Sequence, residues 1–439
     1  MGQITLGSKY DLNHLENYLN PHMKGFEKSP TLAINELSIQ LEKEGKTVYR
    51  FGFGQSPFPV PEFMVKELQN YAREKDYLPV EGLPELREAV AKFYREVKGY
   101  GDVSADEVLI APGSKQLLFL IQFVLNAELL IPVPCWVTYI PQARLLGRKF
   151  HTFPTDADSN WELDPDQLED YLKHHPDSPK LLLLNYYNNP TGTEAMVDNL
   201  KRIAEIARKY GLIVVSDEIY DRLTFTDEYC SIAQYYPEGT IISSGLSKWA
   251  GAGGWRLGTF IFPKQLKQIQ KACAVLASET YSCVAAPIQY AAISAYENRT
   301  LMKKFISKST KILKIISSYC SMRLRQAGIK VNPAAGAFYL FIDFEKFRPK
   351  LAKLGITTGP QLMATLLAES GVALLPGTAF GMPPESLTAR LAYVDFNGAH
   401  ALEKISEYFE YDNDREFLLE IAPHIVKGID ALVQWVKHL

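Results

Sequence analysis

Two cations stand eight positions apart in a stretch of otherwise small, apolar and aromatic residues. The stretch, residues 243–260, reads SSGLSKWAGAGGWRLGTF, and its cations are Lys248 and Arg256. Burial disfavours the charged form of an amine, so a lysine in this setting is neutral and nucleophilic. The planar fork of an arginine suits a phosphate or a carboxylate. Most lysines are simply solvated, so the pair needs support from the rest of the chain before it indicates chemistry.

Chemically distinctive side chains also stand in or just after the last residues of five apolar runs that have the composition of buried strands. The runs are VLIAPG at 108–113, ELLIPVP at 128–134, KLLLLNYYNN at 180–189, LIVVSDEIY at 212–220 and TIISSG at 240–245. In the same order they lead to the turn Gly113-Ser114-Lys115, to Trp136, to Asn189, to Asp217 with Tyr220, and to Lys248. Each of these residues alone has an ordinary interpretation as a cap, a core aromatic or a turn. A coincidence at all five runs is a much weaker explanation than a coincidence at one.

One cofactor would use all five positions. A small-residue turn at a helix start offers backbone N–H groups to a phosphate. A carboxylate at the end of an apolar strand is costly to bury without a partner, and a ring nitrogen would be such a partner. An aromatic side chain can stack on a planar ring, an amide and a phenol can hydrogen-bond a ring oxygen, and an amine can react with an aldehyde. Pyridoxal phosphate has all of these features, so the sequence predicts a pyridoxal phosphate site.

The elements that must position these residues indicate an α/β fold. Continuous apolar strands separated by amphipathic helices, such as the one at 198–211, are typical of a mostly parallel sheet flanked by helices. Ligands of such sheets bind beyond the carboxyl ends of the strands. A long helical pattern at 302–327, followed by strand-like KVNPAAGAFYLFIDF, predicts a second, smaller α+β domain. We expect an N-terminal segment that joins the small domain (1–64), a large cofactor-binding domain (65–310) and the small C-terminal domain (311–439).

The composition is that of a soluble globular enzyme. The 439 residues are 47% hydrophobic and 22% charged with a net charge of −3, which argues against a nucleic-acid surface. The apolar runs are too short to span a bilayer, and the first twenty residues lack the apolar core of a signal peptide. The five cysteines have no C-x-x-C spacing and the eight histidines no ligand spacing. We therefore expect a cytoplasmic protein without disulfides, metal, membrane or nucleic-acid partner.

Several motifs resemble one known family along most of the chain. GLSKWAGAGGWRLG at 245–258 resembles the lysine signature of the class I/II pyridoxal-phosphate-dependent aminotransferases, the aspartate aminotransferase-like enzymes of fold type I. Further similar segments are SPTLAINEL (29–37), FGFGQSPFPVPE (51–62), YLPVEGLPELREAVAKF (77–93), NNPTG, SDEIY, PAAGAFYL, LLPGTAFG and LTARLAY (387–393). The resemblance covers roughly residues 29–410, and residues 1–28 have no counterpart in it.

The resemblance implies a role for each residue around the cofactor ring. Lys248 is implied as the Schiff-base lysine that also shuttles the substrate proton. Asp217 is implied to pair with the ring nitrogen and keep it protonated. Tyr220 and Asn189 are implied to hydrogen-bond the ring oxygen, and Trp136 to stack on the ring.

The resemblance also implies which groups hold the phosphate of the cofactor. The backbone amides of the turn Gly113-Ser114-Lys115 and the guanidinium of Arg256 are implied to hold it. The tyrosine at the position of Tyr77 reaches the phosphate of a neighbouring subunit, which implies a homodimer with active sites at the subunit interface. Many relatives offer a hydroxyl three residues before the lysine, whereas this chain has Gly245 there, and Ser244 and Ser247 are the neighbours that could replace it.

The substrate end of the site rests on the same resemblance. Arg390 is implied to bind the substrate α-carboxylate, with Gly54 and Asn189 nearby. The sequence does not place a second cation for an acidic side chain. Aromatic residues around the motifs, namely Phe53, Phe58, Tyr139 and Tyr281, suggest instead room for an aromatic or aliphatic side chain.

The expected activity is transfer of the amino group of an L-amino acid to a 2-oxo acid in a pyridoxal/pyridoxamine phosphate ping-pong mechanism. A lyase-type relative, such as a C–S β-lyase or an aminocyclopropane-carboxylate synthase, would share the same lysine motif. A non-enzymatic regulator that binds pyridoxal phosphate is the third alternative. The intact set of Lys248, Asp217 and Arg390 opposes that alternative.

Overall fold

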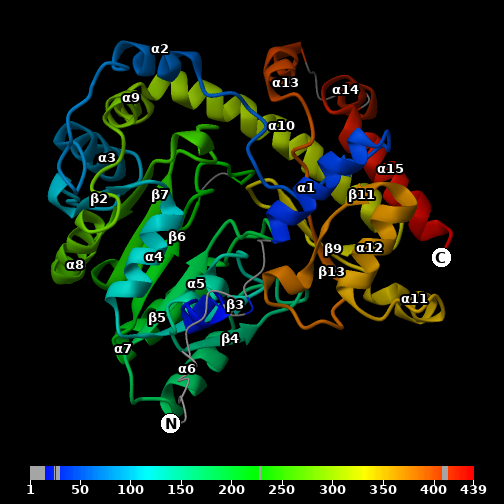
Figure 1. Ribbon diagram of the computed structural model, residues 1–439, viewed down its shortest axis with the longest axis horizontal. Coiled ribbons are helices and arrows are strands. Elements are labelled where there is room, and N and C mark those ends of the chain that lie inside the picture. The colour runs from blue at the N-terminus through cyan, green and yellow to red at the C-terminus, as the bar shows by residue number, and fades with distance from the viewer. Residues whose placement is uncertain (1–14, 24, 26–29, 227–228, 408–413) are drawn as a thin grey trace, which may run out of the picture.

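A seven-stranded sheet forms the centre of the computed structural model, which describes residues 15–23, 25, 30–226, 229–407 and 414–439 (Figure 1). The strands are β2 (Val108–Ala111), β3 (Glu128–Val133), β4 (Phe150–Pro154), β5 (Lys180–Asn185), β6 (Ile213–Asp217), β7 (Thr240–Gly245) and β8 (Gly258–Ile261). Their order is β2-β8-β7-β6-β5-β3-β4, and β8 alone runs antiparallel to its neighbours β2 and β7. The predicted mostly parallel sheet is confirmed, and the five apolar runs end at the same edge of it.

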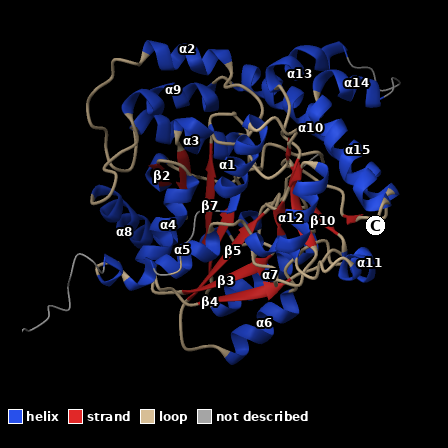
Figure 2. Ribbon diagram, turned by 45° about the vertical axis from the view of Figure 1, so that its right-hand side comes forward, coloured by secondary structure: helices blue, strands red, loops and turns tan. Residues whose placement is uncertain are grey.

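Helices cover both faces of this sheet, which explains why its strands are apolar at successive positions (Figure 2). In β5, Leu181 and Leu183 belong to one buried cluster while Leu182 and Leu184 belong to another. The first cluster includes side chains of α4 (Ser114–Val124), α5 (Tyr139–Leu145) and α8 (Lys267–Ser278). The second includes side chains of α6 (Pro165–His174) and α7 (Val197–Tyr210).

Three further helices lie at the β2 end of the sheet. They are α2 (Glu62–Asn70), α3 (Pro84–Glu96) and α9 (Ala286–Glu297), and α2 and α3 both pack on α9. Buried residues of α3 share a hydrophobic cluster with β2, β7 and β8. The long helix α10 (Arg299–Gln326) then leads to the C-terminal part of the chain, close to the bounds predicted for it.

The C-terminal part contains a smaller antiparallel sheet with the strand order β12-β13-β10-β9. Its strands are β9 (Lys330–Val331), β10 (Tyr339–Asp343), β12 (Leu375–Pro376) and β13 (Thr388–Ala392). Its helices are α11 (Arg348–Lys353), α12 (Gly359–Ser370), α13 (Gly398–Lys404), α14 (Asp414–Ile421) and α15 (Pro423–Lys437). This is the second, smaller α+β unit that the pattern after residue 310 predicts.

The N-terminal segment joins this smaller unit. Its short strand β1 (Tyr49–Arg50) pairs in parallel with β11 (Val372–Ala373), and its helix α1 (Pro30–Lys43) lies against β12 (Figure 1). The chain from β1 to α2 therefore passes from the smaller unit to the large sheet. Residues 53–55 lie on that path and reach the carboxyl edge of the large sheet.

One strand of the large sheet escapes prediction from the sequence. The edge strand β4 reads FHTFP and, within the described part of the chain, pairs only with β3. An edge strand needs no continuous apolar run because only one side of its backbone is paired, so its sequence carries a weaker signal. Among the described residues, no helix is long and apolar enough to cross a membrane, and no three His, Cys, Asp or Glu side chains are grouped to hold a metal.

Candidate active site

A cavity of about 500 Å³ opens at the carboxyl edge of the large sheet. Nine of the twelve site residues predicted from the sequence line it, namely Gly54, Ser114, Lys115, Trp136, Asn189, Asp217, Tyr220, Lys248 and Arg256. The other three, Gly113, Arg390 and Tyr77, do not. A larger hollow of about 600 Å³ lies around Tyr100 and Thr240 and contains none of the predicted site residues.

Lys248 follows β7 and projects into the cavity, where its ammonium donates to the Gly54 carbonyl at 2.9 Å. Burial, together with the nearby cations Arg390 and Arg256, lowers the pKa of Lys248 to about 7, and Asp217 opposes this shift. A large fraction of this amine is therefore neutral at physiological pH. A neutral amine is the form that attacks a carbonyl.

Asp217 ends β6 and is 4% exposed. Its Oδ2 accepts a hydrogen bond from the Tyr139 hydroxyl at 2.7 Å, and its Oδ1 has no hydrogen-bond partner in the described part of the chain. Burial raises the pKa of Asp217 to about 6, although the Tyr139 hydrogen bond, the backbone of Ile219 and Lys248 favour the anion. A buried carboxylate oxygen without a partner is costly, so this oxygen is positioned for a donor that enters the cavity.

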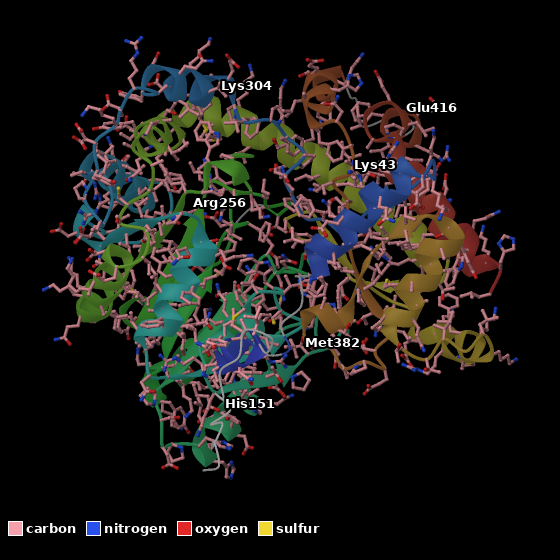
Figure 3. The ribbon with its side chains drawn as sticks, in the orientation of Figure 1. Lys43, His151, Arg256, Lys304, Met382 and Glu416 are labelled. Carbon is pink, nitrogen blue, oxygen red and sulfur yellow. The ribbon has the colours of Figure 1, made fainter. Side chains whose placement is uncertain are left out.

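Arg256 and the turn before α4 form a compact cationic corner (Figure 3). Gly113 has φ 92°, and a Cβ on it would lie 2.3 Å from Arg256 Nη2. Arg256 itself is left-handed with φ 53°, and its guanidinium donates to the carbonyls of Gly253 at 2.8 Å and Pro112 at 3.3 Å. The glycine thus lets the guanidinium reach the N-terminus of α4, where free backbone N–H groups of the first turn also favour an anion.

Arg390 lies on β13 behind the cavity wall and is 2% exposed. It donates to Asn189 Oδ1 at 3.1 Å and to the Gly52 carbonyl at 2.7 Å, and its Nε has no partner among the residues that the structure describes. Burial lowers the pKa of Arg390. A guanidinium that is held by two neutral oxygens, and by no carboxylate of the described residues, keeps its charge available for an anionic ligand.

Tyr220 and Tyr339 make a direct contact at the inner end of the cavity. Their hydroxyl oxygens are 2.8 Å apart, and burial together with this neighbour raises the pKa of Tyr220 well above its ordinary value. Tyr220 is therefore a neutral phenol that can donate one hydrogen bond. Asn189 is predicted to bind the same ring oxygen as Tyr220. Its backbone is held in place by a hydrogen bond, because its N–H donates to Asn185 Oδ1 at 2.8 Å.

Trp136 lines the opposite wall of the cavity. Its indole packs edge-on against Tyr139, with the ring centroids 5.5 Å apart. The Lys115 ammonium lies 5.3 Å from the centroid of the Trp136 ring. Burial and the nearby Arg256 lower the pKa of Lys115.

Other sequence predictions have mixed outcomes. The side chain of Tyr77 is 91% exposed and does not approach the cavity of its own chain. A Cβ on Gly245 would lie 2.7 Å from the Leu257 carbonyl, so a hydroxyl side chain does not fit there, while Ser247 lines the cavity. Of the four aromatic residues suggested for a substrate pocket, only Phe53 lines the cavity; the other three are Phe58, packed in the core, Tyr139, bonded to Asp217, and Tyr281.

Sequence reasoning missed two residues that the structure brings into the site. Tyr139 was counted only as an aromatic neighbour, yet it is the donor to Asp217. Tyr339 comes from the smaller sheet, about ninety positions beyond Lys248, and contacts Tyr220. The spacing W-V-T-Y at 136–139 could have indicated Tyr139, because a residue three positions on shares one face of a helical turn with the first.

Comparison with known proteins places this geometry in a family. The family described as aminotransferase class I and II matches residues 46–398. The aspartate aminotransferase of Geobacillus stearothermophilus is 33% identical over 395 residues, which are 87% of this chain and 96% of that protein. The chain belongs to the class I and II aminotransferases.

Other relatives support the same assignment. The probable aspartate/prephenate aminotransferase of Thermus aquaticus is 30% identical over 89% of this chain and 98% of its own length. The solved aspartate aminotransferase of Thermus thermophilus with maleate superposes with a TM-score of 0.81 at 25% identity, covering 95% of this chain and 99% of that one. The chain is accordingly a pyridoxal-phosphate-dependent aminotransferase of fold type I.

The cavity has the chemistry that this cofactor needs. The free Oδ1 of Asp217 suits a protonated ring nitrogen, and the largely neutral amine of Lys248 suits an aldehyde. The corner of Gly113, Ser114 and Arg256 suits a phosphate. These three groups line or border one cavity, so the residues present fit pyridoxal phosphate.

Proposed function

We propose that this chain transfers the amino group of an L-amino acid with an acidic side chain to a 2-oxo acid, in two half-reactions at the cavity around Lys248. The single observation that carries the proposal is the convergence of a largely neutral Lys248 amine, a partly unbonded buried Asp217 and the Arg256 corner on one cavity. Each group matches one part of the cofactor on which the family depends.

When bound, pyridoxal phosphate supplies an aldehyde carbon that takes up the amino group and a ring that accepts the electron pair left on the substrate carbon. Asp217 holds its charge beside the ring nitrogen, and Tyr139 keeps that carboxylate ionised and oriented. Tyr220 and Asn189 would donate to the ring oxygen, and Trp136 would cover a ring face, since all three line the cavity. Lys248 would take the proton from the substrate α-carbon and deliver it to the former aldehyde carbon of the cofactor, on the other side of the transferred nitrogen.

The phosphate is held by the helix start and the guanidinium. The backbone N–H groups of Ser114 and Lys115 lie at the first turn of α4, beside the Gly113 turn and Arg256. Ser247 takes the place of the hydroxyl that many relatives have at the position of Gly245, because it lines the cavity and Gly245 has no room for a side chain.

Arg390 binds the substrate α-carboxylate as a bidentate partner. The support for this role is its buried guanidinium, held by Asn189 and the Gly52 carbonyl next to Gly54 but not neutralised. Gly54 contributes its backbone at the same place, where its carbonyl contacts Lys248. Arg390 and Lys248 thus bind two carbonyls of the same short backbone segment, those of Gly52 and Gly54.

Lys115 is the cation for an acidic side chain. Three cations line the cavity, and Lys248 and Arg256 are assigned to the reacting amine and the phosphate, which leaves the Lys115 ammonium beside Trp136. Related proteins are named aspartate and aspartate/prephenate aminotransferases, and one was solved with maleate, a dicarboxylate. This assignment replaces the aromatic side-chain pocket that the sequence suggested.

A panel of amino donors with one 2-oxo acceptor tests the substrate. We expect the highest kcat/KM for aspartate or glutamate, and Lys115→Met should lower it by roughly 10- to 100-fold, the loss of one hydrogen bond to a charged group. The same variant should leave kcat/KM for alanine within about twofold, since the backbone of Lys115 is unchanged. An unchanged aspartate value in Lys115→Met, or a preference for aromatic donors, would remove the acidic-substrate proposal.

The reaction type is tested by one half-reaction. Adding aspartate to the loaded enzyme without any 2-oxo acid should convert the bound cofactor stoichiometrically to pyridoxamine phosphate, which is followed by its absorbance. Release of ammonia together with a 2-oxo acid, independent of an amino acceptor, would instead identify a lyase and refute the transaminase mechanism for this chain.

We further propose a cytoplasmic homodimer in which Tyr77 completes the phosphate site of the neighbouring subunit. The exposed Tyr77 ring and the composition support this arrangement. Mixing Lys248→Ala and Tyr77→Phe subunits should restore activity, because one site of each hybrid dimer then holds both native residues. A monomer in solution, or no recovery on mixing, would contradict the dimer.

For the domains we propose the divisions 1–64, 65–310 and 311–439, with α10 crossing from the large to the small domain.

A further inference from the structure

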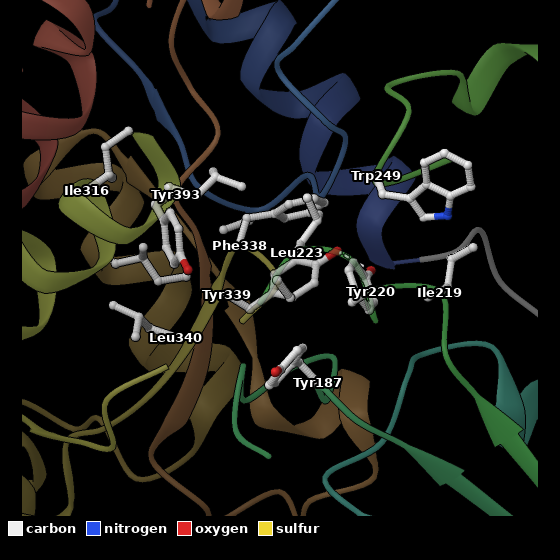
Figure 4. Close-up of a cluster of buried hydrophobic side chains, with 14 of the residues drawn as sticks. Tyr187, Ile219, Tyr220, Leu223, Trp249, Ile316, Phe338, Tyr339, Leu340 and Tyr393 are labelled. Carbon is white, nitrogen blue, oxygen red and sulfur yellow. Dashed lines mark hydrogen bonds between the residues drawn. The ribbon is translucent and has the colours of Figure 1, made fainter. Parts of the chain in front are cut away.

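Tyr339 lies beside Tyr220 in the buried cluster that borders the cavity (Figure 4), and it also contacts Gly54 and Arg390. It begins β10 in the smaller sheet, yet its hydroxyl lies 2.8 Å from the Tyr220 hydroxyl and 3.5 Å from the Gly54 carbonyl. The Arg390 guanidinium lies over its ring, 4.8 Å from the centroid.

The backbone around Tyr339 is built to admit its ring. A Cβ on Gly54 would lie 2.3 Å from the Tyr339 hydroxyl oxygen, so this position needs a glycine for the phenol to reach Tyr220. A Cβ on Gly192 would lie 2.4 Å from the Tyr339 carbonyl. Close approach on both sides fixes the ring, which is buried and packs edge-on against Tyr220 with the centroids 5.6 Å apart.

The hydroxyl of Tyr339 has one hydrogen and two acceptors within reach. A carbonyl oxygen can only accept, so a Tyr339 hydrogen directed at Gly54 would oblige Tyr220 to donate to Tyr339. A Tyr339 hydrogen directed at Tyr220 leaves the Tyr220 hydrogen free to point into the cavity. The shorter distance favours the second arrangement, which also leaves the Gly54 carbonyl to the Lys248 ammonium.

We propose that Tyr339 is a positioning residue of this enzyme: its hydroxyl donates to Tyr220 and thereby turns the Tyr220 hydrogen toward the cofactor ring oxygen, while its ring supports Arg390. The inference rests on the proposed function. Tyr339, a side chain of the smaller sheet, thereby connects Tyr220 at the cofactor end of the site with Arg390 at the substrate-carboxylate end. A hydrogen bond received by a hydroxyl also strengthens the hydrogen bond that the same hydroxyl donates.

Other titratable groups surround the two hydroxyls. Burial raises the pKa of both tyrosines, so both are neutral phenols and the direction of their hydrogens is what varies. Among the described residues, the titratable groups that interact with Tyr220 or Tyr339 are Asp217, Tyr139, Lys248 and Arg390.

The test is the pH titration of the absorbance of the bound cofactor in the holoenzyme. Stronger donation to the ring oxygen stabilises it as an anion, so weaker donation should raise the pKa that the absorbance reports. We expect Tyr339→Phe to raise this midpoint by about 0.3 to 0.7 unit, as expected for one neutral hydrogen bond, and Tyr220→Phe to raise it further. In the Tyr220→Phe background, Tyr339→Phe should cause no additional shift, because Tyr339 acts through Tyr220.

The roles of the Tyr339 ring and of the Tyr339 hydroxyl can be tested separately. Tyr339→Phe keeps an aromatic face under Arg390, so KM for the amino donor should change by less than about twofold. Tyr339→Leu lacks both features, so it should show the same rise of the midpoint and a KM about 3- to 10-fold higher, as expected for a lost cation–π contact. Tyr393→Phe is the matched control, since Tyr393 is a fully buried tyrosine of the same cluster whose hydroxyl lies outside this network (Figure 4).

Each result separates this inference from the proposed function. A rise of the midpoint in Tyr339→Phe that vanishes in the Tyr220→Phe background supports the inference. No shift in Tyr339→Phe and Tyr339→Leu while Tyr220→Phe shifts, or equal additive shifts in both backgrounds, overturns it and leaves the proposed function intact. A wild-type protein that acquires no lysine-dependent cofactor absorbance overturns the proposed function itself.

Discussion

The hydrogen bond from Tyr139 to Asp217 should set the acid limit of cofactor binding. Asp217 Oδ2 accepts this bond at 2.7 Å, and the pKa of the buried carboxyl is about 6. In Tyr139→Phe the carboxylate loses a donor worth about 1.5–3 kcal/mol, which corresponds to a pKa rise of roughly 1–2 units. The pKa of Asp217 should then lie between about 7 and about 8.

The direction of the pH dependence follows from which protonation form of Asp217 binds the cofactor. The carboxylate is the form that pairs with a protonated ring nitrogen, so affinity is lost as the pH falls through the pKa of Asp217. At pH 7 the carboxylate is about 90% ionised in the wild type and about 10–50% ionised in Tyr139→Phe. Because apparent affinity scales with the competent fraction, the dissociation constant should rise roughly two- to tenfold at pH 7 and approach the wild-type value near pH 9.

The assay should avoid the amine of Lys248, whose pKa of about 7 lies in the same range. Pyridoxamine phosphate has no aldehyde and so reports the carboxylate without reaction at the lysine. Its dissociation constant would be measured by fluorescence titration of the apoenzyme from pH 5 to pH 9. Tyr281→Phe is the control, because its hydroxyl donates to the Ile110 carbonyl at 3.4 Å and not to Asp217. Parallel profiles for wild type and Tyr139→Phe would refute the reasoning.

Three further predictions concern the other parts of the site. Lys248→Ala should bind pyridoxal phosphate without a borohydride-reducible linkage and lose nearly all transamination; a cofactor that remained reducibly attached would show that another residue is the attachment site. Gly113→Ala should weaken cofactor binding at least tenfold in the same fluorescence titration, since its Cβ would lie 2.3 Å from Arg256 Nη2 at a φ of 92°; unchanged affinity would mean that the corner does not hold the phosphate. Arg390→Lys should raise KM for every amino donor by about tenfold or more with a smaller change in kcat, because the bidentate geometry is lost; an effect confined to acidic donors would place Arg390 at the side chain instead.

The sequence by itself determined the fold class and most of the cavity wall. Apolar runs without alternation, such as that of β5, require cover on both faces and therefore predict a parallel sheet between helices. The residue that follows each such run is fixed at the carboxyl edge by chain connectivity alone. This is why Asp217, Asn189 and Lys248, which are far apart along the chain, could be grouped before their positions were known.

Only the tertiary structure decided how these side chains are held. Tyr139 bonds Asp217 across 78 positions, Arg390 bonds Asn189 across 201 and Tyr339 meets Tyr220 across 119. Such partners come from different layers, so no local spacing encodes their pairing. Burial acts in the same way: it lowers the pKa of Lys248 to about 7, whereas the sequence shows only that the residue lies among apolar neighbours. The sequence names the groups that react, and contacts between distant parts of the chain set their protonation and their orientation.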